Sequence, residues 1–178
     1  MKKNIIFAIL TVIILISCSD NKNKDLQNIK DLEKKLTSNS TEIINIKQSK
    51  ELVSFYKDFA KEYPKDTNSV NFLFKAASLS MNIGQAKQSV ELFDKIITDY
   101  PDFSKVSDCM FLKAFVYDEK LKDLVNAKVA YKAFLEKYPT HDFAKDAKAC
   151  LNNLGKTPEQ LIREFEDKQK EDSLHASK

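Results

Sequence analysis

The sequence predicts an all-α fold, a right-handed superhelix of about eight antiparallel helices in which helical hairpins stack on one another. The first observation is a set of three prolines that each follow a tyrosine and stand eight residues after an aromatic residue, at Pro64, Pro101 and Pro139. The second is their spacing of 37 and 38 residues, which is typical of helical-hairpin repeats. The third is the composition, with 31% charged residues, two glycines and no tryptophan.

A repeat of this kind indicates a binding function. One hairpin cannot bury its apolar face alone, so neighbouring hairpins stack and leave a concave surface for a partner. We therefore expect a scaffold that binds other proteins, and the pattern argues against an enzyme. The charge gives no case for nucleic acid, because the formal net charge is only +3 and falls to +1 if a segment with Lys2 and Lys3 is removed.

The first eighteen residues resemble the export signal of a bacterial lipoprotein. Lys2 and Lys3 precede an apolar run at residues 5–16, which is too short to span a bilayer as a mature helix. Residues 15–18, Leu-Ile-Ser-Cys, resemble the lipobox that is cut before an acylated cysteine. The resemblance implies that Cys18 carries a lipid anchor of the palmitate type, and two or more acyl chains give stable attachment. The alternative is an ordinary secretory signal with an incidental cysteine.

Ser19, rather than aspartate, follows this cysteine, which resembles an outer-membrane address in lipoprotein sorting. We therefore expect the protein to be attached by lipid to the outer membrane, on its periplasmic face. The expected organisation is a removed signal peptide at 1–17, a lipidated tether at 18–24, a capping helix and loop at 25–46, a helical repeat domain at 47–172 and a frayed tail at 173–178.

Apolar residues at helical spacing place the predicted helices. An N-terminal helix is expected over 25–36, followed by a loop at 37–41. We interpret this helix as a cap on the repeat stack; a coiled-coil stub is the alternative, although fewer than two heptads are present. The repeats predict further helices over 48–63, 69–81, 85–100, 106–118, 126–138 and 142–154. Gly84 suits the turn after 69–81, because a helix C-terminus with positive φ favours glycine.

The last helix begins with a specific start signal. Thr157 is expected as its N-cap, Pro158 as its first residue and Gln160 as the reciprocal partner in a capping box. An apolar stripe then suits a terminal cap, at Leu161, Ile162 and Phe165. Residues 168–178 are charged, and we expect them to fray.

These patterns resemble tetratricopeptide repeats, which combine small residues in the first helix, an aromatic residue in the second and a terminal proline. The matching small residues are Ala76, Ala77 and Ala114. The strings at residues 92–101 and 134–139 are similar to small bacterial tetratricopeptide lipoproteins, a group that includes the outer-membrane assembly lipoprotein BamD and the C-terminal domain of YbgF. The likeness covers roughly residues 50–168 and departs from the family at Leu52 and Ser89, where an alanine is typical.

Candidate reactive groups are few. Cys109 and Cys150 are interpreted as two small buried side chains; a disulfide between them is the alternative, in a compartment where disulfides persist. His141 is interpreted as a solvated residue of an inter-repeat turn, and His175 as part of the frayed tail. No spacing fits a metal site and no glycine-rich loop could hold phosphate, so no catalytic residue, metal, cofactor or small-molecule substrate is predicted.

The resemblance implies a partner-binding groove on the first helix of each hairpin. The family pattern assigns to this groove a mostly apolar set of residues: Asn71, Phe74, Ser78 and Met81 in one repeat, and Cys109, Leu112, Val116 and Glu119 in the next. Such a groove suits an apolar or helical peptide. The alternative is that these side chains are buried, either within the stack or beneath the helix over 25–36.

The predicted function is a lipid-anchored scaffold or adaptor that binds envelope proteins at the outer membrane. Family analogy adds outer-membrane protein assembly or envelope maintenance as the process. The alternative is a peptidoglycan-associated coordinator of the envelope or of cell division, of the YbgF type.

Overall fold

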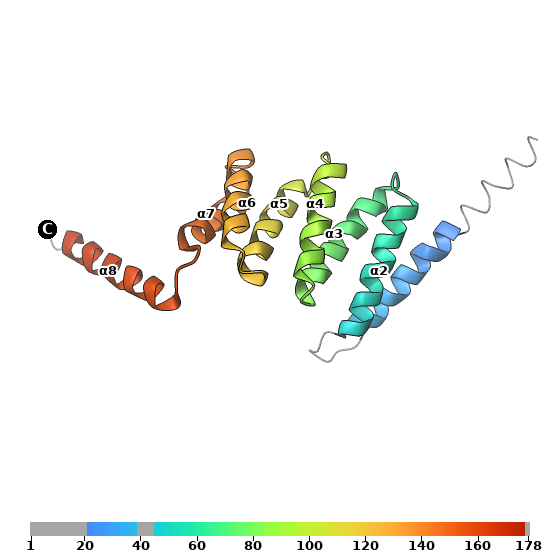
Figure 1. The fold of residues 1–178 in the computed structure, drawn as a ribbon, viewed down its shortest axis with the longest axis horizontal. Coiled ribbons are helices and arrows are strands. Elements are labelled where there is room, and N and C mark those ends of the chain that lie inside the picture. Colours follow the sequence, from blue (N-terminus) through green and yellow to red (C-terminus); the bar gives the residue numbers. More distant parts are fainter. Residues whose placement is uncertain (1–20, 39–44, 177–178) are drawn as a thin grey trace, which may run out of the picture. The chain divides into compact units, whose positions relative to one another are not determined.

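The computed structural model describes residues 21–38 and 45–176, and every regular element in these two ranges is helical (Figure 1). Residues 21–38 form an N-terminal helix. The remaining elements are α2 (Ile46–Glu62), α3 (Thr67–Asn82), α4 (Ala86–Asp99), α5 (Val106–Phe115), a π-helical turn η1 (Val116–Lys120), α6 (Leu124–Lys137), α7 (Ala144–Asn153) and α8 (Pro158–Ala176). The predicted all-α helical-repeat class, with about eight helices, is confirmed. The contacts divide the chain into two compact units, Met1–Leu92 and Phe93–Lys178.

Three helices end in the same way at a Tyr-Pro pair. At the ends of α2, α4 and α6, the backbone N–H of Tyr63, Tyr100 and Tyr138 donates to the carbonyl oxygen four residues earlier, at 2.8 to 3.0 Å. The following proline pushes the tyrosine out of the α region, and φ is −121° at Tyr63 and −133° at Tyr138. The prolines therefore stop these helices, as the sequence predicts.

The turns inside the two central hairpins use a left-handed residue at equivalent positions. Gly84 follows α3 and has φ of 77°, which confirms its predicted role. Lys122, 38 residues later, has φ of 53° and is the one positive-φ residue other than glycine in the described part of the chain. The second turn therefore repeats the geometry of the first with a residue that suits it less well.

The helix predicted over 106–118 ends earlier than expected. α5 stops at Phe115, and the next five residues form η1, closed by a 3.0 Å bond from the Leu121 N–H to the Val116 carbonyl oxygen. Apolar spacing carries no signal for a turn in which the N–H reaches back five residues instead of four. Asp118 is buried in this wider turn.

The N-terminal helix, α2 and α3 pack together in the first unit. Ile29 of the N-terminal helix is only 1% exposed. The Tyr56 and Phe72 rings stack with centroids 5.2 Å apart, and Phe59 meets Phe72 edge-on at 5.0 Å. The N-terminal helix thus packs against both α2 and α3.

This N-terminal helix is longer at both ends than the predicted range of 25–36. Lys22 forms an ion pair with Asp66, the N-cap of α3, and the Tyr63 hydroxyl donates to Asp25 Oδ2 at 2.9 Å. At its other end, Thr37 Oγ1 donates to the carbonyl oxygen of Glu33 at 3.0 Å. These bonds hold terminal residues that local sequence alone assigns to a tether and a loop.

In the second unit, the core lies between α5, α6 and α7. Phe111 is central to it, with ring centroids 5.7 Å from Phe134, 6.1 Å from Tyr131 and 4.7 Å from Phe143. Ala114 is fully buried beside this cluster, as are Ala76 and Ala77 in the first unit. Small residues therefore stand at the buried positions where the sequence predicts that two helices pack closely.

α8 begins at the predicted capping box. The Thr157 N–H donates to Gln160 Oε1 at 2.8 Å, and the Gln160 N–H donates to Thr157 Oγ1 at 3.3 Å. The helix then continues to Ala176 instead of fraying after residue 168. Its apolar stripe does not close the repeat stack, because Ile162 and Phe165 remain exposed.

Candidate functional site

An open, mostly apolar cleft of about 700 Å³ lies in the first unit. Three helices form its walls. The lining residues are Lys30, Glu33, Lys34, Leu36 and Thr37 from the N-terminal helix, Leu52 and Tyr56 from α2, and Phe74, Lys75, Ser78, Leu79 and Asn82 from α3. A cleft of this size whose exposed surface is mainly apolar is typical of a binding site for an apolar side chain or a short segment of a partner.

Glu33 joins the three walls of this cleft. Its Oε1 accepts a 2.6 Å hydrogen bond from the Tyr56 hydroxyl and a 2.7 Å bond from Lys75 Nζ. The same Nζ lies 5.9 Å from the centre of the Tyr56 ring and 5.7 Å from that of Phe72, within the range of cation–π attraction. The network thereby fixes the N-terminal helix against α2 and α3.

The protonation states of this network are set by the same contacts. Burial alone would raise the pKa of Glu33, but the bonds from Lys75 and Tyr56 lower the pKa below its ordinary value. Burial, followed by the bond to Glu33, raises the pKa of Tyr56 far above its ordinary value. Glu33 is therefore a carboxylate at neutral pH, and Tyr56 keeps its proton.

The rim of the cleft is positively charged. Lys30 and Lys34 are exposed and one helical turn apart on the N-terminal helix. Together with Lys75 they place three cations against the single carboxylate of Glu33. An apolar lining beneath a basic rim is chemically suited to an amphipathic segment that carries acidic residues.

The sequence-predicted groove residues of α3 divide between this cleft and its surroundings. Phe74 and Ser78 line the cleft and are half-buried. Met81 is also half-buried and Asn71 is exposed, and neither lies in the cleft wall. The side-chain amide of Asn71 donates to the carbonyl oxygen of Thr67 at 3.0 Å.

The groove residues predicted for the second unit do not form one open face. Cys109 and Val116 are fully buried, and Leu112 is half-buried against the Phe111 core. Glu119 is exposed and lines a separate cavity of about 520 Å³ that also reaches Cys150. Cys109 and Val116 therefore fit the alternative interpretation in which these side chains are buried within the stack.

This second cavity contains a buried acid. Asp118 of η1 is 9% exposed and accepts a 3.4 Å hydrogen bond from the Tyr131 hydroxyl. Burial, together with the charge of neighbouring Glu119, raises the pKa of Asp118, and Lys122 only partly offsets this effect. The long bond from Tyr131 leaves Asp118 poorly stabilised as an anion.

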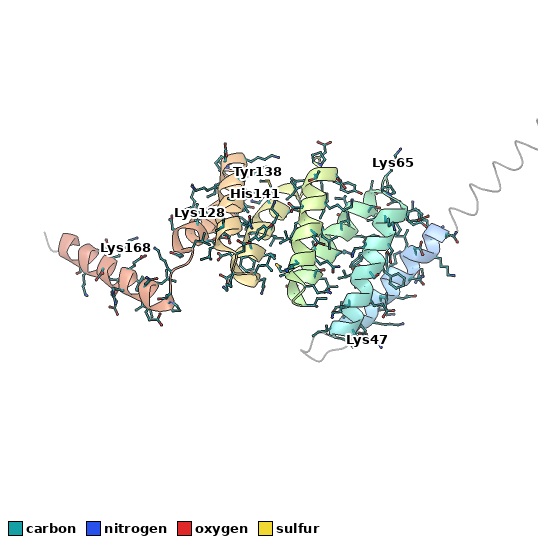
Figure 2. The ribbon with its side chains drawn as sticks, in the orientation of Figure 1. Lys47, Lys65, Lys128, Tyr138, His141 and Lys168 are labelled. Carbon is teal, nitrogen blue, oxygen red and sulfur yellow. The ribbon has the colours of Figure 1, made fainter. Side chains whose placement is uncertain are left out.

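His141 occupies an inter-repeat turn, but the prediction that it is solvated is wrong. It is half-buried, and its ring centroid lies 5.7 Å from that of Phe134, edge-on, and 6.3 Å from that of Tyr138. Figure 2 shows His141 and Tyr138 close together near the end of α6. Its Nδ1 accepts a 3.2 Å bond from the Phe143 N–H, and its Nε2 lies 3.4 Å from Asp108 Oδ1. The aromatic residues around this turn therefore give His141 a packing role.

Both described cysteines are free thiols. Cys109 is buried and Cys150 is half-buried, in agreement with the interpretation that favours unbridged side chains. Burial raises the pKa of Cys109 to about 12, so its thiol is not a reactive nucleophile. Cys18, the predicted lipid attachment site, lies outside the described residues, as do the apolar run at 5–16 and Ser19.

Sequence reasoning missed the lysine rim and the Glu33 network. The 30–34 segment does carry a signal, two lysines one turn apart on the edge of an amphipathic helix. In the described ranges, no group of three or more His, Cys, Asp or Glu side chains is placed to hold a metal ion. None of the helices in those ranges combines the length and apolarity needed to cross a bilayer.

Comparison with known proteins identifies the two central hairpins. Residues 72–102 and 108–141 match the family model of the tetratricopeptide repeat. The first segment comprises most of α3 and all of α4, and the second comprises most of α5, η1 and α6. No curated protein and no solved structure shows significant similarity to the chain. These two segments are therefore similar to tetratricopeptide repeats, a family that generally acts as a scaffold for protein–protein interaction.

Proposed function

We propose that this chain is a lipid-anchored scaffold that binds protein partners at the outer membrane of a bacterial envelope. The observation that supports it is the apolar cleft of the first unit, with its basic rim of Lys30, Lys34 and Lys75. A scaffold role in outer-membrane protein assembly or envelope maintenance would need such a site. The cleft is the place where we expect the partner to bind.

The chemistry of the cleft defines the class of partner. Phe74 and Leu79 offer apolar contact, and the exposed lysines on the N-terminal helix attract carboxylates. Glu33 already accepts hydrogen bonds from Tyr56 and Lys75, so we do not expect its carboxylate to bind the partner. We therefore propose an amphipathic peptide or helix with acidic flanks as the occupant.

Site-specific photo-crosslinking tests the cleft directly. A photoreactive amino acid at Ser78, inside the cleft, should capture an envelope protein in intact cells. The same group at Lys57, an exposed position of α2 outside the cleft wall, is the matched control. Equal capture of the same protein from both positions would contradict a specific site.

Charge reversal then tests the rim. The pair Lys30→Glu and Lys34→Glu should reduce capture from Ser78 by at least about tenfold, because two attractive contacts become repulsive. Both side chains are exposed, so the helical circular dichroism spectrum should be unchanged. Undiminished capture would mean that the acidic partner chemistry is wrong.

The anchor has its own test. Cys18→Ala should move the protein from the outer-membrane fraction to a soluble or inner-membrane fraction, since the acyl chains are proposed as its only attachment. A pull-down on purified sacculi examines the peptidoglycan alternative. Retention of the wild-type chain on sacculi, without any crosslinked protein partner, would favour that alternative over the scaffold.

A further inference from the structure

Exposed apolar side chains of the second unit gather on two helices. On α6, Val125 is 75% exposed and Val129 is 64% exposed; on α8, Ile162 is 59% exposed and Phe165 is 62% exposed. Each pair is spaced three or four residues apart, so each forms a short stripe on one side of its helix. Large exposed apolar side chains that are grouped in this way suit an interaction surface.

The charges around these two stripes are opposite. α8 carries six acidic and three basic side chains, a net charge of −3. α6 carries three lysines and one glutamate, a net charge of +2, and its exposed Lys128 and Lys132 stand one turn apart beside Val125 and Val129. Figure 2 labels Lys128 on α6, and on α8 it labels Lys168, one of that helix's few cations. The α8 surface is thus complementary to the α6 surface in both apolarity and charge.

We propose that the second unit forms a twofold dimer in which α8 of each copy packs its Ile162 and Phe165 face on the Val125 and Val129 face of α6 in the other copy. Every copy carries both surfaces, so two copies bury both stripes reciprocally and the assembly closes. The net negative charge of α8 disfavours an anionic lipid surface as the occupant. The proposal is independent of the cleft in the first unit.

A crosslinking experiment with isotope-labelled copies tests this contact. A photoreactive phenylalanine analogue replaces Phe165 in the full chain, purified in mild detergent, and unlabelled and ¹⁵N-labelled chains are mixed before irradiation. We expect crosslinked peptides that join position 165 to the segment around Val125 and Val129, with one peptide of each isotope. The same analogue at Arg163, roughly 160° around the helix, is the control and should not reach that segment.

The outcomes separate the possible occupants. Mixed-isotope products that contain the α6 segment support the dimer. Products with a single isotope only would mean that α8 folds back on its own chain, and products elsewhere or none at all would equally overturn the proposal.

Sedimentation velocity supplies a second measurement. Val129→Asp should weaken dimerisation by at least about tenfold, because it places a charge in the apolar contact. Lys128→Glu with Lys132→Glu should weaken it as well, and adding Glu166→Lys with Asp172→Lys should restore it. These side chains are exposed, so all variants should keep the helical circular dichroism spectrum of the wild type. A wild-type chain that stays monomeric at roughly 100 μM would refute the model. So would a failure of Glu166→Lys with Asp172→Lys to restore dimerisation to the chain that carries Lys128→Glu and Lys132→Glu.

Discussion

Lys122 holds a backbone conformation that its own side chain disfavours. Its φ of 53° lies in the left-handed region, where a Cβ atom comes close to the following carbonyl oxygen. Gly84, at the equivalent position of the preceding hairpin, has the same handedness without that cost. The side chain of Lys122 forms an exposed 3.1 Å ion pair with Glu119, which contributes little, and its charge only partly offsets the burial of Asp118.

We therefore expect Lys122→Gly to raise the free energy of unfolding by about 0.5–1 kcal/mol, after allowing for the greater freedom of glycine in the unfolded chain. Urea denaturation followed by circular dichroism measures the change. Lys148→Gly, at an exposed position in the interior of α7, is the control and should lower stability by about 1 kcal/mol. If both substitutions destabilise equally, the strain assigned to Lys122 is absent.

The buried carboxyl group of Asp118 makes the stability of the protein depend on pH. Burial raises the pKa of Asp118 in the folded protein, so the folded state holds its proton at pH values where the unfolded state has lost it. Between the ordinary aspartate pKa and the raised folded value, stability falls as pH rises. Above that pH range, the buried carboxylate lowers the free energy of unfolding by its full amount. Below that range it has no effect, because Asp118 is protonated in both the folded and the unfolded state.

Asp118→Asn removes this charge and keeps an oxygen that can accept the bond from Tyr131. At pH 7 the variant should have a higher free energy of unfolding than the wild type. The gain should shrink as pH falls through that range and vanish at low pH. Denaturation curves of both proteins across the pH range measure it, and Glu136→Gln, at an exposed position of α6, is the control. A variant that is less stable than the wild type at pH 7 would contradict a costly charge.

At the scale of helices, local chemistry predicted most of the boundaries. Tyr63-Pro64 and the Thr157–Gln160 capping box act through residues one to four positions apart, so the signal and its effect are both contained in the sequence. Gly84 is predictable for the same reason, because the turn demands a conformation that glycine adopts freely. Such signals hold whatever the helix later packs against.

The elements that differed from expectation depend on contacts distant in sequence. The N-terminal helix extends past its predicted ends where Lys22 meets Asp66, 44 residues away. The α8 stripe at Ile162 and Phe165 has the periodicity of a buried cap, yet periodicity does not say which surface covers it. η1 replaces an ordinary helix end without any change in apolar spacing.

The candidate site was predictable in part for the same reason. The family pattern selected Phe74 and Ser78 from the positions of α3 alone, and both line the cleft. The opposite wall comes from the N-terminal helix, and the Lys75 to Glu33 bond joins residues 42 positions apart. The family pattern also assigned Val116 to the groove, but this side chain is fully buried.

Considered as a whole, the molecule divides its core between two units. Phe59 of α2 and Phe134 of α6 stand five residues before Pro64 and Pro139, so they are the same position of the repeat. Phe59 packs against Phe72 in the first unit, and Phe134 packs against Phe111 in the second. Repeat proteins gain stability from each unit and its nearest neighbours, so damage to one core should stay largely local.

We expect Phe134→Ala to cost roughly 3–5 kcal/mol in the second unit, because it removes a fully buried ring and leaves a cavity. Native-state hydrogen exchange should then show lost protection in α5, α6 and α7, while α2 and α3 keep theirs. Phe59→Ala is the matched variant and should produce the reverse pattern, with exchange rising first in the N-terminal helix, α2 and α3. If either substitution lowers protection equally in both units, the chain unfolds as one cooperative body and the division into local cores does not hold.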